Sequence, residues 1–441
     1  MKILFVNGSP RGRYSVTLQS CLYLEKRFPQ HRFEHLNVGT GIDIFERDMS
    51  GAAAALASAE LIIFAYPVYS FLVPSQLHRF IELLKGSGIP LRDKYVSQLT
   101  TSKHFFDITA HRFIEENCRD MGMRVIKGLS ADSEDLLSEK GQQEAESFLE
   151  YAVFCAENAL YEKAAPVPSP VPAPYENSFT PVKKDDGFDV VIVGNLADGD
   201  ESLRAMIKDF DAVFPYRTRF VNLADFPFKG GCLGCLNCTI NGKCVYTDGF
   251  DSFLEKEIAN ADAVVYAFTL RDHSMGSRFK MFDDRQFCRG YRAICEGKPS
   301  ACICSGDLSG ETNLLAVLEA RCQVGHSFFA GAADGADSIQ DVSKRLAYAL
   351  KKELVPPTDF TGAGGMKILR DTVWLERGMM RADHEYFRAN GLYDFPQRKL
   401  IKMLRTRILG ALMKSPAIRR RIGNRFNDTM LAPYRKILKK L

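Results

Sequence analysis

Short apolar runs alternate with amphipathic segments over the first 163 residues. Continuously apolar runs of this length are typical of strands that are buried on both faces of a sheet. The segments between them carry apolar residues three or four positions apart, which favours helices. We predict strands at 2–6, 33–37, 61–65, 94–100 and 125–128, with helices at 16–27, 51–59, 75–85, 112–121 and 140–159. This alternation predicts a doubly wound parallel sheet with strand order 2-1-3-4-5.

The same pattern returns in the second part of the chain. The apolar runs at 189–193, 260–268 and 298–304 match the first, third and fourth strands of the first part. The second strand of this copy is predicted at 218–223, and the spacing between the runs predicts an insertion after it. We therefore predict two tandem α/β domains at 1–163 and 188–355, joined by a semi-rigid Pro-rich linker at 164–187.

A basic helical tail is predicted at 356–441, with helices at 366–380, 382–389, 399–413 and 417–426. From residue 398 onward there are fourteen Lys and Arg residues and one acidic residue, Asp428. Because the whole chain carries only +4, the remainder is net acidic. Basic charge of this kind can contact three partners: the acidic remainder of the chain, an anionic membrane surface contacted peripherally, or nucleic acid. No groove-reading motif accompanies the charge, so we do not expect nucleic acid.

Composition narrows the class of protein. No run approaches the roughly 18 apolar residues of a membrane-spanning helix, and the N-terminal apolar run is too short for a secretory signal. We therefore expect a cytoplasmic protein. Twelve cysteines in such a chain favour metal or redox chemistry over a disulfide framework.

The turn after the first strand is rich in hydrogen-bond donors. Ser9, Ser15 and Thr17 carry hydroxyl groups, and Arg11 carries a positive charge. The free N–H groups at the start of the following helix point toward the same place. These residues predict a phosphate-binding cradle, although the spacing is neither the dinucleotide fingerprint nor the nucleotide triphosphate loop.

The insertion in the second copy carries the most specific motif of the chain. Four cysteines follow the spacing C-x2-C-x2-C-x5-C in a Gly-rich loop: Cys232, Cys235, Cys238 and Cys244. This compact spacing favours the corners of a [4Fe–4S] cluster. Zinc more often takes two C-x2-C pairs that are far apart in sequence. A zinc site and a loop of free thiols remain as alternatives.

The turn G-S-P-R at 8–11, followed by Ser15 and Thr17, resembles the phosphate loop of the flavodoxin-like NAD(P)H-dependent FMN reductases. The cysteine spacing resembles the iron–sulfur flavoprotein branch of the same family. The resemblance implies two tandem flavodoxin-like domains, FMN as cofactor and NAD(P)H as co-substrate. It also implies that two further segments hold the flavin ring: Pro67, Val68, Tyr69, Ser70 and Phe71 along its edge, and Thr100, Thr101, Ser102 and His104 at its polar atoms.

Each copy retains what the other lacks. The loop at 194–201 has three acidic residues where the first copy has its cradle, and the first copy has no cysteines at 39–50. In the resembled family the flavin lies at a subunit interface. We therefore predict an internal pseudo-dimer, with one FMN on the first domain and one cluster on the second; assembly into homo-oligomers is also compatible with the sequence.

The predicted function is electron transfer from NAD(P)H through FMN and the cluster to a small-molecule or protein acceptor. Hydride transfer to a flavin needs no protein acid or base, so no catalytic residue is assigned. Two alternatives remain open. One is an NAD(P)H-dependent quinone or nitro reductase without a cluster, and the other is a non-catalytic electron carrier or redox scaffold.

Overall fold

The computed structural model describes residues 1–164, 167, 174–294, 296–395, 399–418, 431–432 and 434–440. The described chain forms two units, Met1–Glu385 and Tyr386–Leu441. Most of the Pro-rich stretch in the predicted linker lies outside the described residues, as do Cys295 and most of the predicted helix at 417–426.

The first sheet has the predicted order, β2-β1-β3-β4-β5, and its strand pairs are parallel. Its strands are β1 (Lys2–Asn7), β2 (Arg32–Asn37), β3 (Leu61–Pro67), β4 (Tyr95–Ser102) and β5 (Arg124–Val125), and β6 (Leu129–Asp132) also pairs with β4. The predicted fifth strand is thus two short pieces. The helices are α1 (Val16–Arg27), α2 (Val38–Arg47), α3 (Ser50–Ser58), α4 (Ser75–Gly86), α5 (Asp107–Asp120) and α6 (Glu139–Glu157).

Helix α2 is absent from the prediction. Two glycines, Gly39 and Gly41, interrupt its sequence, and Gly41 departs from helical geometry at φ −113°. Glycine disfavours helices by about 1 kcal/mol relative to alanine, which hides the helical pattern. Gly39 is nevertheless required at its position, because a Cβ there would lie 2.3 Å from the backbone carbonyl of Ser9.

The second sheet has the order β8-β7-β9-β10-β11, which is again 2-1-3-4-5 when counted within this half. Its strands are β7 (Asp185–Gly194), β8 (Tyr216–Asn222), β9 (Ala263–Thr269), β10 (Ser300–Ser305) and β11 (Phe329–Ala333). Its helices are α7 (Glu201–Val213), α8 (Asn237–Asn241), α9 (Phe250–Glu257), α10 (Ser277–Arg285), α11 (Thr312–Val324) and α12 (Ala336–Lys352). The predicted fold class is confirmed, whereas an origin by duplication stays a prediction.

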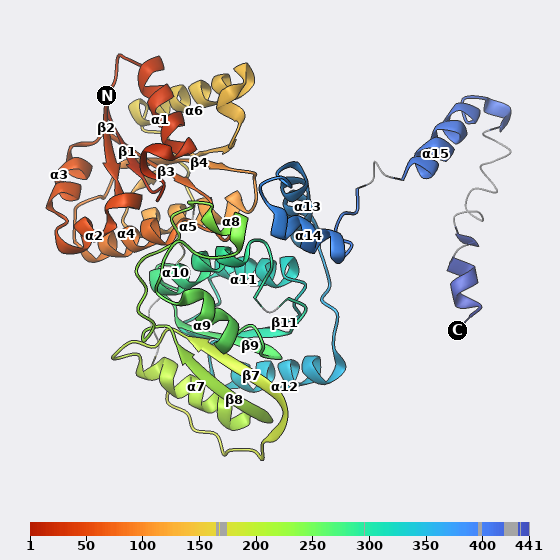
Figure 1. The fold of residues 1–441 in the computed structure, drawn as a ribbon. Coiled ribbons are helices and arrows are strands. Elements are labelled where there is room, and N and C mark those ends of the chain that lie inside the picture. The colour runs from red at the N-terminus through yellow and green to blue at the C-terminus, as the bar shows by residue number, and fades with distance from the viewer. Residues whose placement is uncertain are drawn as a thin grey trace. The chain divides into compact units, whose positions relative to one another are not determined.

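The two halves of the first unit meet through equivalent helices, α4 and α5 from one and α10 and α11 from the other (Figure 1). Ser75 and Ser277 begin α4 and α10. The backbone N–H of Ser75 donates to Asp284 at 2.8 Å, and that of Ser277 donates to Glu82 at 2.6 Å. Each helix therefore caps the start of the other with a carboxylate from its last turns, and this gives the interface approximate twofold symmetry.

Apolar side chains continue the core of the first half across this interface. Val317 and Ala320 of α11 are buried in the same cluster as residues of β1, β3 and α4. Beside them, His273 of the second half is held between Asp120 of α5 and Glu311, with distances of 3.0 Å to each. Apolar contact and paired charges together make the two halves one unit.

Two further helices, α13 (Phe360–Leu375) and the start of α14 (Arg381–Ala389), also belong to the first unit. The sequence placed the beginning of the tail at 356, whereas the first unit ends at Glu385. The reason is that α13 packs against α11. The second unit includes α15 (Leu400–Leu412), which has no buried side chain. None of the helices in the described part of the chain combines the length and the apolar character that a membrane-spanning segment needs.

We expect the stability of the first unit to depend on the charge of His273. Burial alone would lower the pKa of His273, but its hydrogen bonds to Asp120 and Glu311 outweigh burial and raise the pKa to about 9. The group therefore stabilises the fold fully below the unfolded value of 6.5, and this contribution is lost as the pH rises through 9.

Chemical unfolding of the wild type and of His273→Gln at a series of pH values measures this effect. The difference in unfolding free energy should shrink by on the order of 3 kcal/mol between pH 6 and pH 10. Neighbouring Glu116, whose pKa is raised by burial to about 7, is present in both proteins and largely cancels. A difference that does not change with pH would contradict the assignment.

Candidate functional site

A cavity of about 480 Å³ lies where the two halves meet. Its walls come from the turn after β1, the segment after β3, the end of β4, the cysteine loop, and the chain that follows α10. Among the predicted residues, the cavity is lined by Ser9, Arg11, Ser15, Thr17, Pro67, Val68, Tyr69, Thr101, Ser102, Cys232, Cys235, Cys238 and Cys244. The structure thus brings the predicted anion cradle and all four predicted thiols to one cavity.

The predicted cradle forms a tight turn at the start of α1. Ser15 is the N-cap of α1, and its hydroxyl accepts a hydrogen bond from the backbone N–H of Leu18 at 3.3 Å. Thr17 and Thr101 share a hydrogen bond of 2.6 Å, which joins this turn to the end of β4. Ser9, Ser15 and Thr17 are almost fully buried, whereas Arg11 is exposed at the rim. Hydroxyls and helix N–H groups in this arrangement fit an anion.

The segment after β3 is a strained turn beside the cavity. Ser70 and Phe71 have positive φ values of 41° and 72°, and two backbone hydrogen bonds of 2.8 and 2.9 Å between Tyr69 and Leu72 close the turn. Positive φ in non-glycine residues is uncommon and is held here by surrounding contacts. Ser70 and Phe71 line an adjoining cavity of about 290 Å³, which shares Val68 and Ser102 with the main one.

Two predicted residues do not line either cavity. Thr100 is fully buried and bonds Nε2 of His111 at 2.8 Å. Its neighbour Thr101 faces the main cavity instead, because successive side chains of a strand point to opposite faces. His104 turns outward and lies 2.9 Å from Asp107. The predicted flavin contacts of Thr100 and His104 therefore have no geometrical support.

The cysteine loop packs directly on the first half. A Cβ on Gly231 would lie 2.2 Å from the hydroxyl oxygen of Ser75, and one on Gly234 would lie 2.0 Å from that of Tyr69. Gly234 also has φ +61°, so a side chain is disfavoured there twice over. In addition, the side-chain amide of Gln76 donates to the carbonyl of Cys232 at 3.2 Å. These contacts hold the thiols against the cavity that contains the cradle.

Arg285 fastens both ends of the cysteine loop. Its guanidinium donates to the carbonyl of Gly230 before the first cysteine and to both carboxylate oxygens of Asp248 after the last one, at 2.8–2.9 Å. The same group lies over the ring of Tyr246, 4.5 Å from its centre. Arg285 is fully buried, so these contacts are well ordered by packing. The sequence did not predict this role of Arg285.

The donor set of the loop fits a metal cluster. Cys232, Cys238 and Cys244 are partly buried and Cys235 is exposed. Burial raises the pKa of Cys232 to about 12 and that of Cys238 to about 11, so a metal centre must displace protons from them. In the described chain, no three of these thiols lie within 4.8 Å of one another. Tetrahedral zinc, with Zn–S distances of about 2.3 Å, needs a closer set than an iron–sulfur cube does.

The region after the second domain also contributes to the cavity, which the sequence did not predict. Thr372 of α13 lines both cavities. Glu376, Met379, Met380 and Asp383 follow it along the wall of the main cavity. The carboxylate of Asp383 accepts a hydrogen bond from the backbone N–H of Tyr291 at 3.0 Å, which ties this segment to the wall. No sequence motif marked these residues, because they reach the site only through the packing of α13.

The first domain is similar to a known protein family. The family model of the NADPH-dependent FMN reductases matches residues 1–131. A curated relative, an iron–sulfur flavoprotein of Clostridioides difficile, is 21% identical over 169 residues, which cover 35% of this chain and 74% of the relative.

Similar solved structures match only about a third of this chain, and their TM-scores are low. They include general stress protein 14 of Treponema denticola in complex with FMN, at 10% identity, a TM-score of 0.30, and coverage of 35% of this chain and 99% of that one. An NAD(P)H:quinone oxidoreductase of Methanothermobacter marburgensis has 11% identity, a TM-score of 0.27, and coverage of 37% and 98%.

The fold assignment rests on the strand order of the two sheets, which is that of a flavodoxin-like domain in each. The similarity to the NADPH-dependent FMN reductase family covers residues 1–131 and ends before the second sheet, so it concerns the first domain alone.

Proposed function

We propose that this chain is an FMN-dependent oxidoreductase that takes hydride from NAD(P)H and passes electrons through a [4Fe–4S] cluster to an acceptor. The observation that carries the proposal is the single cavity lined by the cradle of the first half and the four thiols of the second. Its volume, about 480 Å³, lies within the range of small-molecule sites.

The residues of the first half would hold FMN by its phosphate and by one edge. Ser9, Ser15 and Thr17 would bond the phosphate, and Arg11 at the rim would offset its charge. Tyr69 would pack beside the ring system because it lines the same cavity, where its ring lies edge-on to that of Phe287 with centres 5.7 Å apart. When bound, FMN accepts two electrons as hydride and releases them singly, which suits a cluster as the next carrier.

The residues of the second half would hold the cluster through Cys232, Cys235, Cys238 and Cys244. Arg285 and Asp248 keep the loop closed, and the glycine contacts with Ser75 and Tyr69 keep it at the flavin cavity. The adjoining cavity, walled by Phe71, Phe105 and Tyr291, offers space for the substrate that exchanges hydride. The two halves together would act as an internal pseudo-dimer.

The tail has a different proposed role, which is peripheral contact with an anionic membrane. Leu400, Leu404, Ile408 and Leu412 recur every four residues of α15 and form one apolar stripe. Arg405 and Arg407 flank the stripe on either side, and residues 399–418 contain no acidic residue. An apolar stripe bordered by cationic side chains is typical of helices that lie in a membrane surface.

The cluster is tested by measuring iron, sulfide, FMN and the visible spectrum of anaerobically purified protein. We expect about four irons and one FMN per chain, with the iron lost and the FMN retained when all four loop cysteines are changed to serine. Cys155→Ala, which removes a buried thiol outside the loop, should retain both. If the protein binds one FMN but no iron, the cluster is refuted and the chain is a plain FMN reductase. If it binds FMN but does not oxidise NAD(P)H, it is an electron carrier.

The cradle is tested by a pair of glycine substitutions. Gly39→Ala pushes a Cβ into the carbonyl of Ser9 and should raise the dissociation constant of FMN at least about tenfold. Gly51→Ala meets no atom within 4 Å. It should leave FMN affinity unchanged and raise the unfolding free energy by about 0.5–1 kcal/mol. Fluorescence titration of the apoprotein with FMN measures both, and equal affinities would contradict the proposed phosphate site.

The tail is tested by co-sedimentation with vesicles of neutral lipid and of neutral lipid mixed with phosphatidylserine. We expect binding only to the anionic vesicles. The binding should be strongest at low salt, because salt screens the attraction between the basic side chains and the lipid. Ile408→Glu and Thr406→Glu change the charge equally, but only the first disrupts the apolar stripe. Ile408→Glu should therefore weaken binding at least about tenfold more. Equal effects, or no binding by the wild type, would refute insertion of this stripe.

A further inference from the structure

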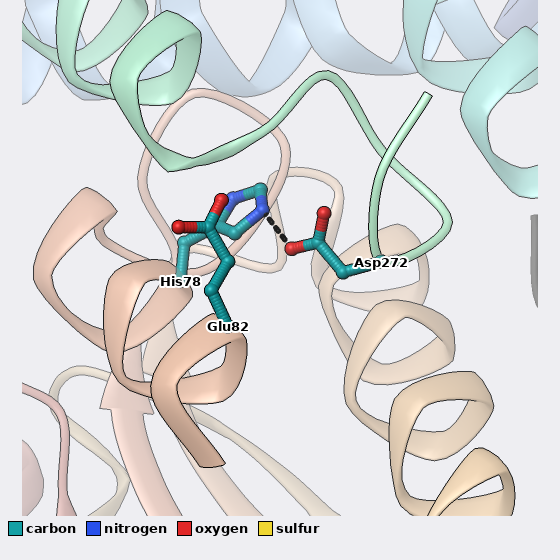
Figure 2. A group of neighbouring side chains, drawn as sticks. All are labelled: His78, Glu82 and Asp272. Atoms are coloured by element: carbon teal, nitrogen blue, oxygen red, sulfur yellow. Dashed lines mark ion pairs between the residues drawn. The ribbon is translucent and has the colours of Figure 1, made fainter. Parts of the chain in front are cut away.

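The interface between the two halves contains a buried group of acidic and imidazole side chains that the proposed electron transfer does not use. His78 and Glu82 lie one turn apart on α4, and Asp272 comes from a turn of the second half (Figure 2). One ligand atom from each residue lies within 4.8 Å of the other two. None of the three lines either cavity described above.

Parts of this group lack partners although they are buried. His78 is 0% exposed and Asp272 is 7% exposed. Nε2 of His78 contacts Oδ2 of Asp272, but Nδ1 of His78 and Oδ1 of Asp272 have no hydrogen-bond partner in the described part of the chain. Glu82 accepts bonds from Ser277 and Arg79 and still has a free lone-pair direction, since a carboxylate has about four. Buried polar atoms without partners are costly.

The approximate symmetry of the interface supplies a direct comparison. The positions of His78 and Glu82 on α4 correspond to those of Lys280 and Asp284 on α10. The ammonium of Lys280 contacts Asp284 and donates to the carbonyl of Tyr69 at 2.9 Å. At the position on α10, one cation therefore balances one carboxylate. The turn of the first half has Ser70 where the turn of the second half has Asp272, so it adds no second carboxylate there.

The same position in the first half lacks a buried positive charge to match the two acids. It has two carboxylates, Glu82 and Asp272, and an imidazole in place of the ammonium. The neighbouring cations are shared with other acids: Arg79, which is partly exposed, pairs with both Glu82 and Glu46, and Lys85 pairs with Asp120. A divalent cation beside a neutral imidazole would balance the two carboxylates without drawing on these shared cations.

We propose that His78, Glu82 and Asp272 bind a divalent transition-metal ion such as Zn²⁺ or Mn²⁺, which links the two halves of the chain. One imidazole and two carboxylates suit ions of this class, and a histidine and a carboxylate one helical turn apart can share one ion. Asp272 is presented by a turn in which it and His273 have positive φ values of 46° and 58°. The proposed role of the ion is structural, since none of its ligands lines either of the two cavities described above.

The site is tested in full-length protein whose four loop cysteines have been changed to serine, so that no thiol of the loop competes for metal. After chelation, this protein is dialysed against Zn²⁺ or Mn²⁺ and its metal content is measured. We expect about one ion per chain, and at least tenfold weaker binding after a further Asp272→Asn or His78→Gln substitution. The control is His35→Gln, which removes another His–Glu pair, 3.0 Å apart, without a third ligand; it should not change the binding.

Thermal unfolding provides a second measurement that does not require the site variants to fold. The four-serine protein should melt at least about 2 °C higher with Zn²⁺ or Mn²⁺ than with chelator, because the ion binds only the folded interface. Failure to bind an ion, or binding and melting that are unchanged by Asp272→Asn, would overturn the proposal. The group would then be an ion pair between His78 and its two carboxylates. Neither result depends on FMN or on the iron–sulfur cluster.

Discussion

The reciprocal capping of α4 and α10 is the interaction on which the rest of the first unit depends. Each helix begins against a carboxylate of the other, so the first backbone N–H of each helix, at Ser75 and Ser277, has its partner in the opposite half. The segments that precede these helices are the turns after β3 and β9. Because the capping sets where both helices begin, it also sets where these turns lie, and Tyr69 with them.

The position of the cysteine loop follows from the same packing. Ser75 is both the first residue of α4 and the contact of Gly231, and Tyr69 is the contact of Gly234. Arg285, at the end of α10, closes the loop from the other side. The loop can approach the first half this closely only because glycine stands at both contacts. A shared cavity between a flavodoxin-like cradle and a thiol loop is thus a property of the interface rather than of either half.

The two halves share one architecture and differ in chemistry. The strained turn is present in both, at Ser70 and Phe71 and again at Asp272 and His273, although the second half lacks the Pro-Val-Tyr sequence that precedes the turn at 67–69 in the first. The backbone of the turn is alike in both because the helix that follows must begin at the interface. Its side chains are free to differ, which places a hydroxyl in one half and a carboxylate in the other.

The sequence alone predicts the strands, their parallel order, and the residues of the proposed anion cradle and of the thiol loop. These features depend on local periodicity, on the turn chemistry after a strand, and on cysteine spacing, all of which are short-range. It missed α2 because Gly39 disfavours a helix in sequence terms. Glycine is required there by a close contact with Ser9 that exists only in the folded protein. It also predicted that both Thr100 and Thr101 contact the flavin, although adjacent residues of a strand face opposite sides of the sheet.

Which of these segments contact one another could not be predicted from the sequence. The joining of the cradle to the thiol loop, the contribution of Thr372 from α13, and the grouping of His78 with Asp272 all bring together residues far apart in the chain. Such contacts depend on how helices pack across an interface, and that packing is set by many side chains at once. No local pattern in the sequence encodes them, because the residues that meet share no spacing, only a place in the fold.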